Sequence, residues 1–322
     1  MDFDLSDVQT AWKAKGAALG KNLAIDAAAG DVVMGAARVG LLDPSVDLLA
    51  LAVAVEALAF ESPSSAIAFA LHSGAALALA HDGRYSTLLR GETVGSLALS
   101  SDEVPDAKGT RLSGRAAWVA PIADHGIAVV GARVAGGDTV AFAVSLDAEG
   151  VSIEPVRTAA LHGFVCGHLA FRDAQAGEAG PTLPIMARVR LLIASAGLGM
   201  GRRALREALR SAKRAHSAAA WEETVQGLLA DAATDLDAAM MLTWKAALGV
   251  ELSLGEASMA KLAAGAAAQH AVERATQVIG ADSFQRGHIV ERLAQDVRAL
   301  ELFAGRTEAL RAAAAVEVLK VT

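Results

Sequence analysis

The spacing of apolar residues changes twice along this 322-residue chain, and that change limits the folds open to it. Residues 5–90 consist of Ala-rich blocks at helical spacing, separated by breaks that contain Gly and Pro. From about residue 91, short apolar runs punctuated by Gly, Asp and Pro predict strands, and helical periodicity returns beyond the breaker cluster at 176–181. We therefore predict an α+β protein, mainly α, in the order helices, strands, helices.

The same pattern divides the chain into a helical domain at 1–90, a small β domain at 91–182 and a helical bundle at 183–322. Pro63 is expected to begin a helix with Ser62 as its N-cap, and 136–138 is expected to form a hairpin turn. The other elements are expected as strands near 95–99, 126–133, 139–145, 151–155 and 168–172, and as helices near 184–216, 219–247, 255–279, 287–302 and 306–319.

Charge and composition exclude several classes of function. The net charge of −7 and the pI near 5.6 argue against sequence-independent binding of nucleic acid or anionic lipid. The eight histidines, among them His72, His162 and His168, lack the spacing of metal ligands, so we expect no metal. Cys166 is the only cysteine, which excludes an intrachain disulfide and suits a small buried residue in a reducing compartment.

The first residues are acidic, whereas a secretory signal begins with basic residues followed by an apolar core. No uninterrupted apolar run reaches the roughly 20 residues of a membrane span. We therefore expect a cytoplasmic protein with no membrane partner.

Short motifs are spread from the middle of the chain to its end. They read Leu-Ser-Gly-Arg-Ala-Ala-Trp-Val at 112–119, Ala-Arg-Val-Arg at 187–190, Ala-Ser-Met-Ala-Lys at 257–261, Ala-Thr-Gln-Val-Ile-Gly at 275–280, Val-Glu-Arg-Leu at 290–293 and Asp-Val-Arg at 296–298. In this order and at this spacing they resemble the acyl-CoA dehydrogenase family. The resemblance implies an N-terminal helical domain, a middle β-barrel or sandwich domain and a C-terminal four-helix bundle.

That resemblance also implies a function. Members of the family bind FAD between the β domain and the bundle and oxidise an acyl-CoA thioester by α,β-dehydrogenation, in which a carboxylate removes the α-proton. The site must also stabilise the enolate oxygen that develops. The resemblance further implies a homo- or hetero-oligomer, a dimer or a tetramer.

The positions of the usual base depart from the family pattern. One falls on Ala304 and the other on Val189, and neither side chain can accept a proton. Glu301 lies about one helical turn before Ala304 and is expected to project from a different level of the site. Glu308 is expected in the first turn of the last helix, where its negative charge complements the helix dipole. Arg190 is expected to orient the thioester end, and the backbone N–H of Ala304 is retained as a donor to the enolate.

The residues that the resemblance assigns to FAD are also altered. Trp118 is either a neighbour of the flavin edge or a buried core residue, and Arg306 stands where the family has a Thr on the pyrophosphate side. The full set of expected cofactor residues is Ser100, Trp118, Arg214, Gln277, Gly280 and Arg306.

Three functions remain open. The chain is a dehydrogenase with an unidentified base, the base-free subunit of an assembly with a base-bearing paralogue, or a non-catalytic acyl-CoA-binding or scaffold protein that has lost FAD. The missing acid favours the second.

Overall fold

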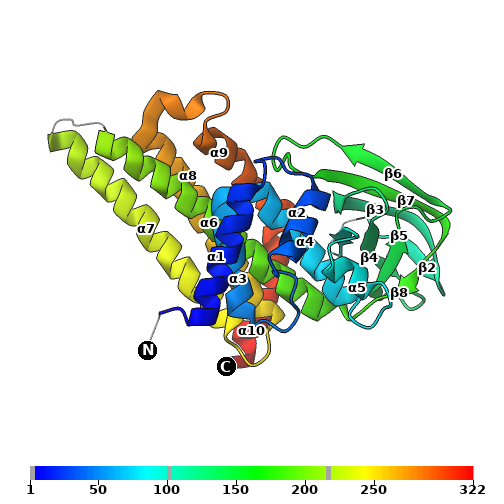
Figure 1. The fold of residues 1–322 in the computed structure, drawn as a ribbon. Helices are drawn as coiled ribbons and strands as arrows, with labels where there is room; N and C mark the ends of the chain where they lie inside the picture. Colours follow the sequence, from blue (N-terminus) through cyan, green and yellow to red (C-terminus); the bar gives the residue numbers. More distant parts are fainter. Residues whose placement is uncertain (1–3, 100–102, 215–218, 322) are drawn as a thin grey trace.

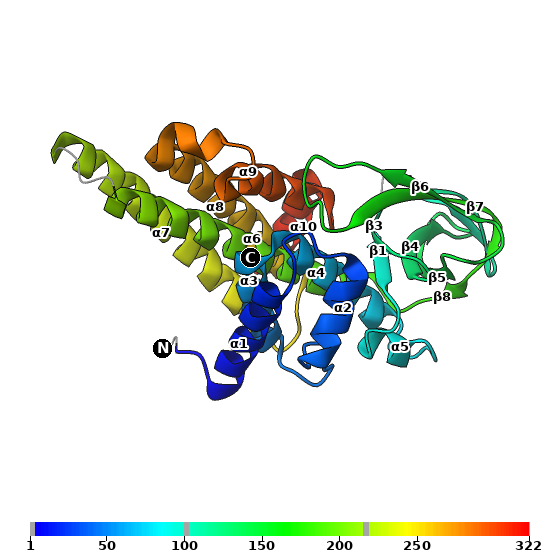
Figure 2. The same cartoon turned by 45° about the horizontal axis from the view of Figure 1, so that its top comes forward.

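The structure is a computed structural model that describes residues 4–99, 103–214 and 219–321 (Figure 1). Helices occupy both ends of the sequence and a sheet lies between them, so the predicted order and fold class are confirmed. The sheet stands at one end of the molecule and the long C-terminal helices extend from the other (Figures 1 and 2). The domain boundaries at 90 and 182 stay predictions.

Five helices form the N-terminal part. They are α1 (Asp7–Asn22), α2 (Ala29–Arg38), α3 (Leu48–Glu61), α4 (Pro63–Ala78) and α5 (Tyr85–Leu89). The helix at Pro63 begins where it was predicted, and Ser62 occupies the N-cap position. The Ser62 hydroxyl makes no side-chain capping bond to the helix and instead donates to Ser65 Oγ at 2.7 Å.

The middle part is an eight-stranded, largely antiparallel sheet in the order β6-β7-β3-β1-β4-β5-β8, with β2 paired to β3 and β4. The predicted hairpin turn is confirmed: Val134 N–H donates to Asp138 O at 2.9 Å, and Gly136 and Gly137 both have positive φ. The strands are β1 (Gly95–Ala98), β2 (Asp106–Lys108), β3 (Arg111–Ile122), β4 (Ile127–Arg133), β5 (Thr139–Ser145), β6 (Val151–Val156), β7 (Val165–Gln175) and β8 (Gly177–Glu178).

The C-terminal part consists of three long helices and two shorter ones. They are α6 (Thr182–Arg214), α7 (Ala219–Ala247), α8 (Leu254–Ile279), α9 (Ile289–Ala299) and α10 (Thr307–Val321), with 3₁₀ turns η1 (Gly280–Phe284) and η2 (Leu300–Leu302). Helix α6 is long and apolar enough to cross a membrane by length and composition, but 83% of its most apolar window is buried. It is the central helix, packed against α3, α4, α7 and α8.

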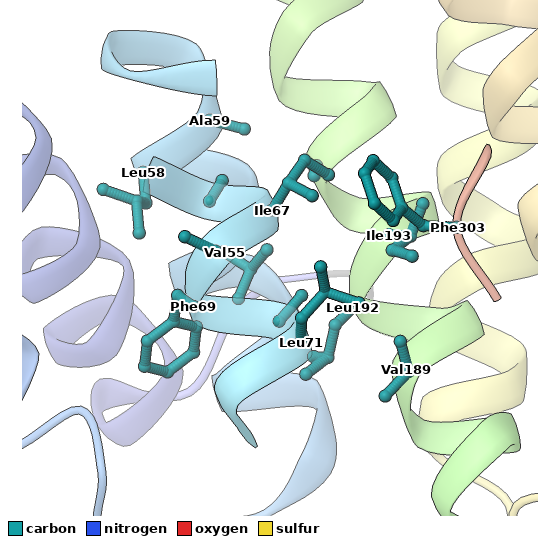
Figure 3. Close-up of a cluster of buried hydrophobic side chains, with 14 of the residues drawn as sticks. Val55, Leu58, Ala59, Ile67, Phe69, Leu71, Val189, Leu192, Ile193 and Phe303 are labelled. Carbon is teal, nitrogen blue, oxygen red and sulfur yellow. The ribbon is translucent and has the colours of Figure 1, made fainter. Parts of the chain in front are cut away.

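One continuous core joins α3 and α4 to α6 and to the segment that follows α9. Figure 3 shows part of it, with the labelled side chains Val55, Leu58, Ala59, Ile67, Phe69, Leu71, Val189, Leu192, Ile193 and Phe303. Because many members are alanines, the helices approach closely. A Cβ on Gly16 of α1, for example, would lie 2.0 Å from the carbonyl oxygen of Ala54 in α3.

This close approach predicts that Gly16→Ala destabilises the protein. The added methyl group must push α1 away from α3, at a cost of about 1–3 kcal/mol in the free energy of unfolding measured by urea denaturation. Gly227→Ala on α7 is the matched control, since nothing lies within 4 Å of its added Cβ. The control should be neutral or stabilising, by up to about 1 kcal/mol. Equal effects of both substitutions would contradict the close-packing account.

Candidate functional site

The connection between η2 and α10 is a sharp turn made by two residues with left-handed backbone conformation. Ala304 has φ +57° and Gly305 has φ +107°, and both are buried. An L-residue with a side chain rarely adopts such a φ, so the turn persists only where surrounding contacts hold it. Phe303 anchors its start in the core and lies near Phe164, with 6.1 Å between ring centroids.

Two buried cations hold this turn from the bundle side. Arg190 of α6 donates from Nε to Ala304 O at 2.8 Å and from Nη1 to Ser258 Oγ of α8 at 2.8 Å. Lys261 of α8 donates from Nζ to Phe303 O at 2.5 Å and to Gly305 O at 2.9 Å. Three consecutive carbonyls therefore accept hydrogen bonds from two cations. We call Arg190 and Lys261 the cation clamp.

The clamp is almost completely desolvated. Arg190 is 6% exposed and Lys261 is 4% exposed. Burial, and to a smaller extent the neighbouring Arg190, lower the pKa of Lys261 to about 7, although Glu301 opposes this shift. Burial also lowers the pKa of Arg190.

A cavity of about 320 Å³ lies on the opposite side of the turn. The sheet, α4, α6 and the turn itself all contribute to its wall, which is mainly apolar. Its lining residues are Leu71, Leu97, Ala98, Leu99, Ala117, Trp118, Met186, Glu301, Leu302, Phe303, Ala304 and Arg306. Among the lining residues in the described part of the chain, Glu301 and Arg306 are the charged ones. The cavity thus suits an apolar group that meets a polar atom at the turn.

Trp118 stands between this cavity and a second one of about 360 Å³. It has φ +56°, lies in an irregularity of the β3–β7 pairing and is 39% exposed. Its backbone N–H donates to His168 Nδ1 at 3.3 Å, and the two rings meet edge to face with 5.6 Å between centroids. The core alternative for Trp118 is therefore wrong. The second cavity also includes Arg157 and Arg298.

Three of the residues singled out from the sequence lie on the first cavity, namely Trp118, Ala304 and Arg306. Arg190 does not line it, and its recorded bonds are to the turn and to Ser258. Val189 is fully buried in the core beside Gly74, where an added Cβ would lie 2.3 Å from Val189 Cγ2.

The remaining expected cofactor residues lie elsewhere. Arg214 is exposed at the end of α6 and donates from Nε to Arg210 O at 3.2 Å. Gln277 is exposed near the end of α8, and Gly280, with φ +74°, is the C-cap of that helix. Gln277 follows Lys261 by 16 residues on the same helix, which corresponds to about 24 Å of rise. Ser100 lies outside the described residues.

Sequence reasoning missed two features of the site. Ser258 and Lys261 were noted only as part of a motif. Because polar side chains are rarely fully buried, their position on the apolar face of α8 could have indicated that they bind other polar groups in the core. Glu301 was expected at a different level, yet it lines the cavity beside Ala304. Its Oε1 accepts from the Thr307 hydroxyl at 3.4 Å.

Comparison with known sequences places the C-terminal part in a described domain. Residues 183–319 match the domain described as "Acyl-CoA dehydrogenase, C-terminal domain". The bovine mitochondrial short-chain specific acyl-CoA dehydrogenase is 33% identical over 159 residues, which cover 46% of this chain and 39% of the bovine protein. The chain therefore spans about two fifths of the length of the relatives it matches.

Comparison with solved structures covers the whole chain. Butyryl-CoA dehydrogenase from Megasphaera elsdenii superposes with a TM-score of 0.88 at 18% identity, over 99% of this chain and 100% of that one. A glutaryl-CoA dehydrogenase in complex with glutaryl-CoA superposes with a TM-score of 0.89 at 17% identity, over 100% and 98% of the two chains. At these identities the likeness concerns the fold.

The lowered pKa of Lys261 predicts a specific pH dependence of stability. Between pH 7 and the ordinary lysine pKa, the unfolded chain binds a proton that the folded chain has released. The contribution of Lys261 to the free energy of unfolding therefore increases as the pH rises through this range. Lys261→Met should remove that contribution, and it should also destabilise the protein because two buried carbonyls lose a donor. The loss should be about 1–3 kcal/mol per carbonyl. Urea denaturation of both proteins at pH 6.5 and 9 measures the difference, and parallel pH profiles would contradict it.

Proposed function

We propose that the chain is a member of the acyl-CoA dehydrogenase family and that it binds FAD and an acyl-CoA thioester at the cavities beside Ala304 and Trp118. The observation that carries this proposal is the buried left-handed turn, which two buried cations hold at the wall of the cavity. A turn held so firmly at the wall of an apolar cavity supports a role in ligand binding.

The residues around Trp118 fit a flavin. The half-exposed indole offers a flat apolar surface, and Arg157 and Arg298 supply cations in the cavity on its other side. FAD, when bound, supplies an acceptor for a hydride from the β-carbon of the substrate. Trp118 and these arginines would hold it, and Arg306 would face the phosphate side.

Arg214, Gln277 and Gly280 are proposed to serve the cofactor of a second subunit. They lie toward the far ends of α6 and α8, away from the cavity of their own chain. A dimer in which the end of one bundle reaches the Trp118 region of the other would unite the two groups of residues. The proposal therefore includes an oligomer.

For activation of a thioester, this chain supplies a hydrogen-bond donor and an apolar wall but no base at position 304. Arg190 and Lys261 bind the turn carbonyls on the side of α6 and α8, and the N–H of Ala304 is the donor assigned to the thioester oxygen. The mainly apolar wall formed by residues such as Leu71, Leu97 and Met186 keeps water from the α-carbon. The methyl group of Ala304 cannot take the α-proton.

For this reason we favour the base-free subunit of a heteromeric dehydrogenase over a self-sufficient enzyme. A paralogue with Glu at the corresponding position would carry out proton abstraction. The self-sufficient alternative rests on Glu301, the carboxylate on the cavity wall, and the scaffold alternative would require that added FAD does not bind.

Restoring the acid tests the main proposal. Ala304→Glu should keep the fold, because Ala304 already carries a Cβ at positive φ. If the proposal holds, purified protein is yellow, wild-type flavin is not bleached by acyl-CoA under anaerobic conditions, and the variant is reduced about 10²- to 10⁴-fold faster. Stopped-flow absorbance with a series of acyl-CoAs measures this rate. Protein that stays colourless with added FAD would refute flavin binding.

Substitution of Glu301 separates the subunit from the self-sufficient enzyme. If the wild-type chain alone bleaches its flavin, Glu301→Gln should reduce that rate by about 10²-fold or more, because the amide cannot accept a proton. Glu308→Gln is the control, since Glu308 is exposed at the start of α10 and does not line the cavity. A wild-type rate that survives Glu301→Gln would exclude Glu301 as the base.

A further inference from the structure

A third cavity lies between the N-terminal helices and the bundle, and it shares no lining residue with the cavity beside Ala304. It has a volume of about 740 Å³, more than twice that of the cavity beside Ala304. Its wall is formed by α1, α3, α6 and α7. We call it the α1–α6 groove and define it by Lys13 and Lys21 of α1, Phe60 of α3, Arg206 of α6 and Trp244 of α7.

The floor of the α1–α6 groove is apolar. Val53, Ala57 and Phe60 come from α3, and Met240 and Trp244 come from α7. Such a floor offers a surface for an alkyl chain or a ring, whose burial is favourable in proportion to the apolar area removed from water.

The wall of the groove carries an excess of positive charge. Lys13, Lys21, Arg202 and Arg206 line it together with two carboxylates, Glu56 and Glu61. Each carboxylate already has an arginine partner, since Arg202 Nε lies 2.8 Å from Glu56 Oε1 and Arg203 Nη1 lies 3.4 Å from Glu61 Oε2. The groove is therefore locally positive, although the chain as a whole has a net charge of −7.

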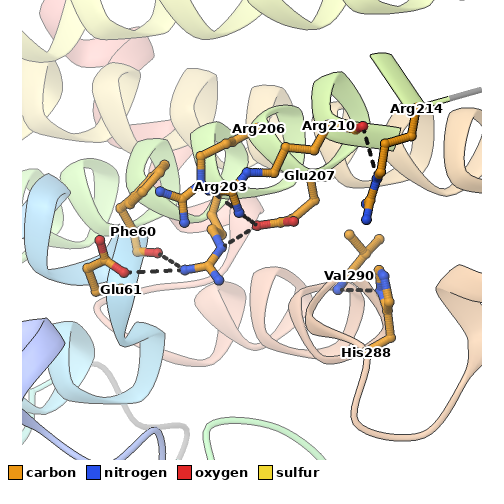
Figure 4. Close-up of polar contacts among 9 residues, drawn as sticks. All are labelled: Phe60, Glu61, Arg203, Arg206, Glu207, Arg210, Arg214, His288 and Val290. Atoms are coloured by element: carbon orange, nitrogen blue, oxygen red, sulfur yellow. Dashed lines mark hydrogen bonds and ion pairs between the residues drawn. The ribbon is translucent and has the colours of Figure 1, made fainter. Parts of the chain in front are cut away.

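Arg206 is only partly compensated by its neighbours. Its guanidinium stacks on the Phe60 ring, 4.0 Å from the centroid, and its Nε is buried with no hydrogen-bond partner among the described residues (Figure 4). The ion pair recorded for it is with Glu207 Oε1 at 3.7 Å, and that oxygen also serves Arg203 at 3.0 Å and Arg210 at 3.1 Å. One carboxylate thus serves three guanidinium groups.

This sharing leaves Arg206 in a repulsive environment. Burial, followed by the charges of Arg203 and Arg210, lowers its pKa. An anion in the groove would offset that repulsion and would offer the guanidinium group of Arg206 a second negative partner besides Glu207.

We propose that the α1–α6 groove is a binding site for an amphipathic carboxylate of the fatty-acid class. The head group binds Arg206 and the two lysines of α1, and the apolar chain lies over Phe60, Ala57 and Trp244. This site is separate from the cavity beside Ala304 and does not rest on the function proposed for that cavity.

Tryptophan fluorescence distinguishes the two sites, because Trp244 lines the groove and Trp118 lines the cavity at the turn. Titration of the full-length chain with octanoate should give a saturable change that is lost in Trp244→Phe and kept in Trp118→Phe. No saturable change, or a change lost only in Trp118→Phe, would overturn the proposal.

A matched pair of charge substitutions tests the head-group contact. Arg206→Gln should weaken octanoate binding about tenfold, whereas Arg210→Gln should change it less than about twofold, because both share Glu207 but only Arg206 lines the groove. If both substitutions weakened octanoate binding equally, the affinity would depend on net charge alone, and the proposed contact with Arg206 would be refuted. If Arg206→Gln does not fold, Lys13→Gln on the exposed side of α1 should weaken binding several-fold, and no weakening would count against the proposal.

Two further ligands test the class of compound. Octanol, which lacks the charge, and inorganic phosphate, which lacks the chain, should each bind at least about tenfold more weakly than octanoate. Octanol binding as tightly as octanoate would exclude a role for the cations. Phosphate binding as tightly would exclude a role for the apolar floor.

Discussion

Two buried cations that donate to three consecutive backbone carbonyls hold the turn on which the site depends. Arg190 comes from α6 and Lys261 from α8, so the conformation of Phe303, Ala304 and Gly305 is set by the packing of two long helices. A buried carbonyl without a donor is costly, and here the donors are desolvated; the bonds from Lys261 are strengthened by charge below its lowered pKa of about 7. The left-handed backbone at Ala304 is therefore fixed by the bundle and does not require any particular side chain.

The helices that hold the turn also connect distant parts of the molecule. Helix α6 packs against α3 and α4, and its residue Met186 lines the cavity beside Ala304. The same helix ends in a basic stretch that includes Arg206 and Arg214. Helix α8 carries Lys261 near its start and Gln277 near its end. Because these helices are long, Lys261 and Gln277 lie about 24 Å apart along α8, so the two ends of one bundle take part in different surroundings.

Much of this arrangement could be predicted from the sequence, because local signals fix where elements begin and end. The bounds of α7 and β5 agree with the predicted ranges 219–247 and 139–145; Gly249 follows the end of α7, and the Gly136-Gly137-Asp138 turn precedes β5. Strand β7 runs from Val165 to Gln175, well beyond the expected 168–172, because its length is set by pairing with β3 far away in the sequence. The roles of Lys261 and Glu301 were missed for the same reason: Lys261 binds carbonyls more than 40 residues away, and Glu301 lines a cavity whose other walls come from the sheet, α4 and α6.

The conformation of Ala304 also bears on which side chains this position can carry. A residue with a Cβ rarely adopts a positive φ, and such a conformation persists only where surrounding contacts hold it. Here the contacts that hold the left-handed turn are made by backbone carbonyls and the two cations, and the methyl group of Ala304 takes no part in them. The path of the backbone is therefore set independently of the side chain at 304, so another L-residue at this position would start from the same left-handed backbone with the rest of the scaffold unchanged.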